Sequence, residues 1–244
     1  MPVILYQRLD SNFSKINGNN NNSISNNYSN DLLYKSIKES FSQTEYELKN
    51  NSNIDIDCSG STCISLLFNK TQIITANVGD SRAIKGQYFE KIKKWKYEIL
   101  SKDHKPDDRE ESLRIKKNHG NIHPYITEDN EYIGPQRIWT NNKNIPGLAI
   151  SRTFGDKIFS KFGVISTPNI LFFRHKLIDK FIVIASDGLW MYVSNQEVVE
   201  IVGKYYESFN CDNAIEELYS VAKTRWEKND DIIDDISIII LFLD

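Results

Sequence analysis

The order of hydrophobic and polar positions predicts strands and helices in separate groups. Residues 61–69 (STCISLLFN) and 71–79 (TQIITANVG) are two short β-rich runs, and the second continues through Gly79 and Asp80 into SRAIKG. This pattern predicts an antiparallel meander with a two-residue hairpin turn at Gly79–Asp80. A further strand pair is predicted near 148–151 and 163–166. Residues 181–186 indicate a buried strand, and ISIIILFL at 236–243 predicts a closing strand that is buried on both faces.

Two segments with the spacing or charge order of a helix flank the predicted meander, one before it and one after it. Leu33, Ile37 and Phe41 recur at the spacing of an amphipathic helix and predict one over 31–50. KPDDREESLRIKKNHG at 105–120 begins with proline and acids and ends with basic residues and a glycine. That charge order is typical of a capped helix.

Two more helices are predicted after the strand at 181–186. Ser194 and Glu197 form a capping box ahead of an apolar face, which predicts a helix over about 195–206. Asp212 is the expected cap of the next helix. The apolar face of that helix comprises Ile215, Leu218, Ala222 and Trp226.

The order of these elements predicts the fold class. Strands separated by hairpins and long excursions, without regular alternation with helices, favour an α+β layered sandwich over a doubly wound parallel sheet. The 244 residues, of which 40% are hydrophobic, suit one large domain over 1–244. An Asn- and Ser-rich tract at 17–30 has almost nothing to bury and is expected to be a disordered insert.

Charge and cysteine usage exclude several classes of function. The net charge is −3, and the Lys and Arg residues are scattered along the chain, so neither a nucleic-acid nor a membrane partner is expected. The most apolar stretch, 236–243, is far shorter than the roughly 20 residues of a membrane span.

Three cysteines without disulfide-framework or zinc-ligand spacing favour a reducing compartment. We expect a cytoplasmic protein, with the nucleus as a second option, and a monomer.

Acids flank two of the most apolar strands. Asp187 follows the first strand, and Asp234 and Asp235 precede the second. If the strands are antiparallel neighbours, these carboxylates converge, and clustered carboxylates favour a hard cation such as Mg²⁺ or Mn²⁺ between them. The alternative on spacing alone is an ordinary Asp-Gly turn together with charges that prevent edge pairing.

Asp103 and His104 form the other candidate for chemistry. They could be a second acidic site or an acid and base pair, and the alternative is capping of the following helix. No serine lies in a Gly-x-Ser-x-Gly elbow, and no phosphate-binding loop of the P-loop type exists.

Seven motifs occur in an order that resembles a known family. They are SGSTC (59–63), ANVGDSRAI (76–84), SKDHKPDD (101–108), PGLAISRTFGD (146–156), GVISTPNI (163–170), IASDGLW (184–190) and DDISIII (234–240). This series is similar to that of the metal-dependent protein serine/threonine phosphatases of type 2C. The match covers about three quarters of the chain.

The resemblance implies a fold, a site and a reaction. The fold is two antiparallel β-sheets in a sandwich flanked by helices, in four layers of α/β/β/α. Two divalent ions, Mg²⁺ or Mn²⁺, are implied at the strand ends, with Asp187 and Asp234 as ligands and Asp103 as the acid of a weaker third ion. A metal-bound water is the implied nucleophile, so no side chain is catalytic. The substrates are phosphoserine and phosphothreonine in proteins.

Other motif residues match mainly architectural positions of the family. These are Ser59–Thr62, Gly79–Arg82, Ser151, Arg152, Gly155 and Asp156.

The chain departs from the family pattern in two places. A phosphate-binding Arg, a metal-ligating Glu and an Asp-Gly-His-Gly-Gly stretch precede SGST in the family and are not found here, and Met191 stands where an acid is common. We therefore expect a truncated form that holds at most a weakly bound ion. Two functions follow: an N-terminally truncated form of an active phosphatase, or an inactive pseudophosphatase that serves as a partner-binding scaffold.

Overall fold

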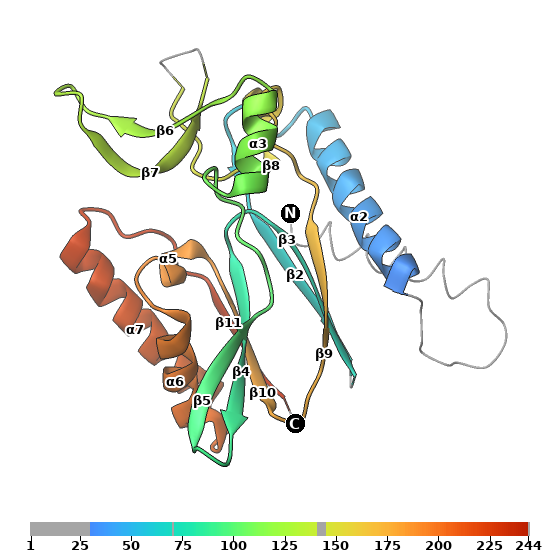
Figure 1. The fold of residues 1–244 in the computed structure, drawn as a ribbon, viewed down its shortest axis with the longest axis vertical. Coiled ribbons are helices and arrows are strands. Elements are labelled where there is room, and N and C mark those ends of the chain that lie inside the picture. The colour runs from blue at the N-terminus through green and yellow to red at the C-terminus, as the bar shows by residue number, and fades with distance from the viewer. Residues whose placement is uncertain (1–29, 70, 141–144, 244) are drawn as a thin grey trace. The chain divides into compact units, whose positions relative to one another are not determined.

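The computed structural model describes residues 30–69, 71–140 and 145–243. The chain divides into two compact units: unit 1 comprises residues 1–63 and 104–168, and unit 2 comprises residues 64–103 and 169–244 (Figure 1). The insert expected at 17–30 lies outside the described residues except for Asn30, and a single domain over 1–244 stays a prediction. No helix in the described part of the chain is long and apolar enough to cross a membrane.

Unit 2 contains two β-sheets and three helices. Its four-stranded sheet has the order β11–β10–β4–β5, and its three-stranded sheet has the order β2–β3–β9. The elements are β2 (Cys63–Phe68), β3 (Gln72–Val78), β4 (Arg82–Phe89), β5 (Lys94–Ile99), β9 (Asn169–Arg174), β10 (Asp179–Ala185), α5 (Asp187–Trp190), α6 (Asn195–Tyr206), α7 (Cys211–Asn229) and β11 (Ile238–Phe242).

The two sheets of unit 2 face each other across a buried core. Ile73 of β3 and Ile182 of β10 belong to one cluster of buried side chains that joins the sheets. On the other face of the four-stranded sheet, Val183 packs with Val198 of α6 and Leu218 of α7. Neighbouring strand residues thus alternate between the sheet-to-sheet core and the helix-covered face, as a period of two requires.

This arrangement confirms the predicted α+β class with antiparallel sheets. β10 pairs antiparallel with both β4 and β11, and β3 pairs antiparallel with β9. In unit 2 the helices α6 and α7 cover the four-stranded sheet, which gives three of the four predicted α/β/β/α layers. The fourth layer, helices on the three-stranded sheet, stays a prediction.

The predicted meander is wrong at its third strand. β3 lies in the three-stranded sheet and β4 lies in the four-stranded sheet, so Gly79 and Asp80 connect two sheets and do not form a hairpin turn. A period-two pattern identifies which residues of a strand share a face, but it does not identify the neighbouring strand. Both strands are rich in buried residues because each packs in the same sandwich.

The closing strand is less buried than predicted. β11 is an edge strand with β10 as its neighbour, and Ile239 is 62% exposed. The prediction of burial on both faces is therefore wrong. The hydrophobicity of the run does not reveal that the strand lies at an edge.

The predicted helices form, but the capping box predicted for α6 is only half present and the cap of α7 is a different residue. α6 begins after Ser194, whose hydroxyl accepts from the Glu197 N–H, but the Glu197 carboxylate binds Arg225 of α7. α7 is capped by Asn210, whose side chain accepts from the Asn213 N–H. The prediction that Asp212 is the cap is wrong, because the chain enters the helix two residues earlier.

The described residues of unit 1 form three helices and two small sheets. Its elements are α2 (Asn30–Asn50), β1 (Gly60–Ser61), α3 (Arg109–Lys117), β6 (Asn121–Ile126), β7 (Tyr132–Trp139), β8 (Phe154–Gly155) and α4 (Lys157–Ser160). α2 and α3 confirm the two helices predicted in this region. Phe41 of α2 stacks on Phe154 of β8 with 5.5 Å between ring centroids.

The strand pair predicted near 148–151 and 163–166 does not form. Leu148 and Ile165 each make one isolated bridge, to Ile138 and to Arg152 respectively. The strands of this region are instead the antiparallel pair β6 and β7, which pack Ile138 against Ile115 of α3.

Candidate functional site

The candidate site lies in unit 2, where β10 ends and β11 begins. Ala185 and Ile238 are the last residues paired between these antiparallel strands. Ser186 continues the pairing, because its N–H donates to the Ser237 carbonyl over 3.1 Å and its hydroxyl accepts from the Ser237 N–H over 3.0 Å. The convergence predicted for the two acidic segments is therefore present.

Asp187 and Asp234 are close to these paired ends. Asp187 is half-buried and begins α5 directly after Ser186, and Asp234 is exposed in the segment that leads into β11. The Ser186 hydroxyl donates to the Asp235 carbonyl over 3.0 Å. A Cβ placed on Gly188 would lie 2.4 Å from that same Asp235 carbonyl oxygen. Only a glycine lets the start of α5 and the acidic segment approach so closely.

Two tryptophans hold the start of α5 in place. The Trp190 indole N–H donates to the Ala185 carbonyl over 2.8 Å, and the Trp226 indole N–H donates to the Gly188 carbonyl over 2.7 Å. Both rings are buried, so the backbone around Asp187 is fixed from β10 and from α7.

Two acidic residues, Asp187 and Asp234, lie on the segments joined where β10 ends and β11 begins. Asp187 and Asp234 offer the carboxylate oxygens that Mg²⁺ and Mn²⁺ prefer. Among residues 30–69, 71–140 and 145–243, however, no group of three or more His, Cys, Asp or Glu side chains could hold a metal ion. The oxygen donors of Asp187 and Asp234 suit a hard divalent cation, and the described part of the chain holds no complete set of ligands.

Asp103 follows β5, and both of its carboxylate oxygens bind Arg82. The Arg82 Nε and Nη2 atoms donate to Asp103 over 3.1 and 2.7 Å. The Nη1 atom of the same guanidinium donates to Asn195 at the start of α6 over 2.8 Å, and its carbon lies 5.4 Å from the Trp190 ring centroid. Asp103 is therefore part of an ion pair that joins β4 to α5 and α6.

Met191 directly follows α5 and is 52% exposed. Its N–H donates to the Asp187 carbonyl, so it closes the short helix. A thioether sulfur is a weak acceptor compared with a carboxylate.

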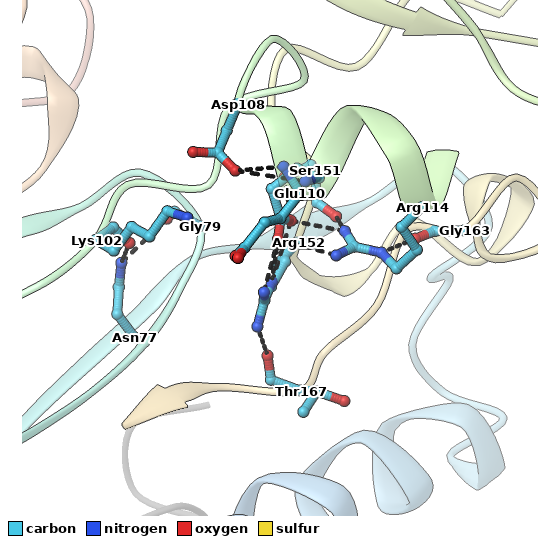
Figure 2. A network of polar contacts seen from close by, with 11 residues as sticks. Asn77, Gly79, Lys102, Asp108, Glu110, Arg114, Ser151, Arg152, Gly163 and Thr167 are labelled. Carbon is cyan, nitrogen blue, oxygen red and sulfur yellow. Dashed lines mark hydrogen bonds and ion pairs between the residues drawn. The ribbon is translucent and has the colours of Figure 1, made fainter. Parts of the chain in front are cut away.

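The SRTFGD motif of unit 1 is organised around a buried carboxylate. Figure 2 shows Arg114, Ser151 and Arg152 together, with Arg114 donating to the Gly163 carbonyl and Arg152 donating to the Thr167 carbonyl. The acceptor that these three side chains share is Glu111 of α3, which is fully buried.

The pKa of Glu111 follows from this environment. Burial by itself raises the pKa, but hydrogen bonds from Arg114, Arg152 and Ser151 outweigh it and hold the pKa well below its ordinary value of 4.5. Ser151 and Arg152 thus have the architectural role expected of them.

A second buried acid ends the same motif. Asp156 has φ 45°, and its carboxylate accepts from the Thr153 hydroxyl over 3.0 Å. Burial raises the pKa of Asp156, the Thr153 hydroxyl lowers it, and the nearby Glu45 carboxylate raises it. A Cβ on Gly60 would lie 1.9 Å from this carboxylate. The SGST motif therefore needs a glycine at this position to leave room for the Asp156 side chain of SRTFGD.

In unit 2 the GDSR motif is fixed by one amide. The Asn77 side chain donates to the Gly79 carbonyl over 3.1 Å and to the Lys102 carbonyl over 2.9 Å (Figure 2). Gly79 has φ 102°, a conformation that side chains disfavour.

Sequence reasoning did not single out Asn77, Glu111 or Asn195. Glu111 carries the only sequence signal, because it stands three residues before Arg114 on a helix. Lys102, one of the two partners of Asn77, and Arg82, the partner of Asn195, are distant in sequence, so no local pattern reveals these contacts.

Comparisons with known proteins agree with this geometry. The family model described as "Protein phosphatase 2C" matches residues 5–230. "Probable protein phosphatase 2C 75" from Oryza sativa subsp. japonica is 34% identical over 211 residues, covering 86% of this chain and 48% of the relative. "Probable protein phosphatase 2C 52" from Arabidopsis thaliana is 35% identical over 218 residues, covering 87% and 44%.

A solved structure shows the same fold. The serine-threonine phosphatase 2C from Toxoplasma gondii superposes with a TM-score of 0.82 at 21% identity, covering 98% of this chain and 78% of the other. The chain spans about half the length of the curated relatives it matches. From the family model, these relatives and the shared fold, the chain belongs to the protein phosphatase 2C family.

Proposed function

We propose that the protein containing this chain is a serine/threonine phosphatase and that Asp187 and Asp234 are two of its metal ligands. The observation that supports the proposal is the joined end of β10 and β11, where the Ser186–Ser237 pairing and the close approach of Gly188 to Asp235 bring the two acidic segments together. The substrates proposed are phosphoserine and phosphothreonine residues of proteins.

The proposed cofactor is Mg²⁺ or Mn²⁺. In phosphatase sites such ions activate water and neutralise charge on the phosphoryl oxygens. The chain's own contribution is to orient Asp187 through the buried Trp190 and Trp226 and to keep Asp235, the neighbour of Asp234, against the start of α5 through Gly188. The described residues leave the ligand set incomplete.

We propose a positioning role for Asp103. Its two oxygens hold the Arg82 guanidinium, which reaches Asn195 and lies over Trp190 of α5. This ion pair braces the helix that carries Asp187. Binding of a third ion by Asp103 would require the Arg82 pair to open.

The remaining features of the proposal concern the whole protein. We propose a monomer in the cytoplasm or nucleus that selects phosphoproteins through surfaces outside the acidic strand ends. The alternative function is a catalytically inactive scaffold that binds phosphoproteins, and the exposed Met191 beside α5 is the observation that favours it.

The test separates turnover from binding. The gene is tagged at its 3′ end, so that the native polypeptide is purified with its whole length, and phosphate release from a phosphothreonine peptide is measured with Mn²⁺. We expect Mn²⁺-dependent release that falls by at least about 100-fold in Asp187→Asn, since a ligand of the reacting ion is lost. Binding of the peptide without phosphate release would overturn the proposal in favour of the scaffold.

A further inference from the structure

Two connections of unit 2 meet at the end of the four-stranded sheet away from Asp187. One is the turn between β4 and β5, and the other is the connection between β9 and β10 (Figure 1). The Tyr88 N–H donates to the Ile178 carbonyl over 3.0 Å, and Gln87 pairs with both Asp179 and Lys96. The two connections are therefore neighbours.

Exposed cations gather on these two connections. We name the set the basic end; it comprises Lys91, Lys93, Lys94, Arg174 and Lys176, all exposed, together with the apolar residues Ile92 and Leu177. Glu90 is an exposed acid within it, and Glu98 beside it pairs with Lys85 over 3.1 Å and with Lys176 of the basic end over 3.9 Å. The chain as a whole carries a net charge of −3, so this end has the opposite sign from the protein average.

Apolar side chains project from the same two connections. Leu177 is 93% exposed and Ile92 is 51% exposed. Ile92 lies between Lys91 and Lys93, and Leu177 directly follows Lys176. Apolar residues flanked by cations match the headgroup and acyl layers of an anionic membrane.

A buried polar network underneath holds the two connections in place. Asp179 accepts from Lys85 over 3.1 Å, from Gln87 over 2.7 Å and from the Lys176 N–H over 2.8 Å. Lys85 and Asp179 have fully buried side chains. The basic end is thus preorganised, which lowers the entropy lost on docking.

We propose that the basic end is a docking surface for an anionic lipid bilayer, on which the protein lies peripherally with Ile92 and Leu177 inserted among the headgroups. The proposal does not depend on the phosphatase proposal. Asp179 and Asp187 bracket β10, so the acidic strand ends lie roughly 20 Å from the basic end along a strand of this length. Docking therefore leaves the acidic strand ends facing away from the lipid.

The proposal reverses the expectation of no membrane partner, and the fold explains why the sequence did not predict this surface. The cations come from segments about 80 residues apart, and no single stretch of the chain is strongly basic. The pairing of β10 with β4 brings them together.

Vesicle sedimentation of the full chain tests the proposal. We expect binding to phosphatidylcholine vesicles that contain phosphatidylserine, no binding to pure phosphatidylcholine, and weaker binding as salt rises. The triple change Lys91→Gln, Lys93→Gln and Lys94→Gln should reduce binding by at least about 10-fold, because each lysine near an anionic surface contributes about 1 kcal/mol. Ile92→Ser with Leu177→Ser should reduce it by about 5-fold or more.

Matched controls use residues of similar exposure elsewhere. Ile232→Ser with Leu113→Ser, and Lys223→Gln with Lys228→Gln, should leave binding unchanged. Circular dichroism checks that each variant folds. A Leu177→Trp variant provides a second readout, because quenching of its fluorescence by brominated lipid requires insertion.

Three results would overturn the proposal. They are no binding to anionic vesicles, binding that the basic-end variants do not change, or capture of an acidic peptide by a chain that ignores vesicles. The last result would assign the basic end to an acidic protein partner.

Discussion

At the end of β10, three consecutive residues have separate structural tasks. Ser186 continues the pairing with β11, Asp187 presents a carboxylate at the start of α5, and Gly188 permits close contact with the Asp235 carbonyl. The sequence pattern predicted the position of Asp187, since a strand followed by Asp-Gly is visible locally. The need for Gly188 was not predictable, because its contact comes from a segment 47 residues away.

Gly188 gives the first residue-scale prediction. In Gly188→Ala the new methyl would meet the Asp235 carbonyl oxygen at 2.4 Å, and the backbone must shift. We expect the free energy of unfolding to fall by about 1–3 kcal/mol. Urea denaturation measures it, with Thr224→Ala on the exposed face of α7 as the control. A Gly188→Ala chain as stable as this control would contradict the close approach.

The Arg82–Asp103 pair gives the second residue-scale prediction. If it braces α5, the effects of Arg82→Met and Asp103→Asn on the free energy of unfolding should not add, and the double-mutant cycle should give a coupling of about 1–2 kcal/mol. The pair is only partly exposed, which limits screening by solvent. Urea denaturation of the two single variants and the double variant measures the coupling. A coupling free energy close to zero would contradict the proposed positioning role of Asp103.

At the scale of elements, helices were predicted better than sheets. The boundaries of α2 and α6 follow from local signals, namely the spacing of Leu33, Ile37 and Phe41 and the cap at Ser194. Strand partners depend on contacts between distant segments, so the assignment of β3 and β4 to one sheet was wrong, and the β6–β7 pair was not predicted.

The cap of α7 is testable because the sequence and the structure disagree. Asn210→Ala should lower the free energy of unfolding by about 1 kcal/mol, since the Asn213 N–H loses its acceptor. Asp212→Ala is the matched comparison and should lower it by less than about 0.5 kcal/mol, because Asp212 only faces the helix dipole. Thermal or urea unfolding of the two variants shows which of the two residues caps α7. A larger effect of Asp212→Ala would restore the predicted cap.

The Glu111 network predicts a pH dependence. The pKa of Glu111 is lower in the folded chain than its ordinary value of 4.5, so its contribution to stability is fully present above pH 4.5 and is lost as the pH falls toward the folded pKa. Glu111→Gln should therefore be less stable than wild type by about 3 kcal/mol near pH 7, with Arg114 and Arg152 left without their carboxylate. The difference should shrink at acid pH.

Urea denaturation at neutral and acid pH measures this difference. Glu110→Gln, an exposed acid in the same first turn, is the control and should change stability by less than about 1 kcal/mol at either pH. A Glu111→Gln penalty that is independent of pH would show that shape, and not charge, holds the network together.

At the scale of the whole molecule, the fold gathers residues that the sequence scatters. The α+β class and the convergence of the segments that carry Asp187 and Asp234 were predictable, because both depend on two strongly apolar strands with acids at their ends. The Arg82 pair, the Glu111 network and the basic end were not predictable, because each joins segments whose pairing no local pattern specifies.

The central claim is that Asp187 and Asp234 act on one metal-dependent reaction as a unit. The most direct test is the Mn²⁺-dependent release of phosphate from a phosphothreonine peptide by the native polypeptide, its Asp187→Asn and Asp234→Asn variants, and the double variant. Residues that act as a unit have non-additive effects, so each single variant should lose at least about 100-fold and the double variant little more. Full activity in either single variant, or losses that multiply in the double variant, would contradict the account.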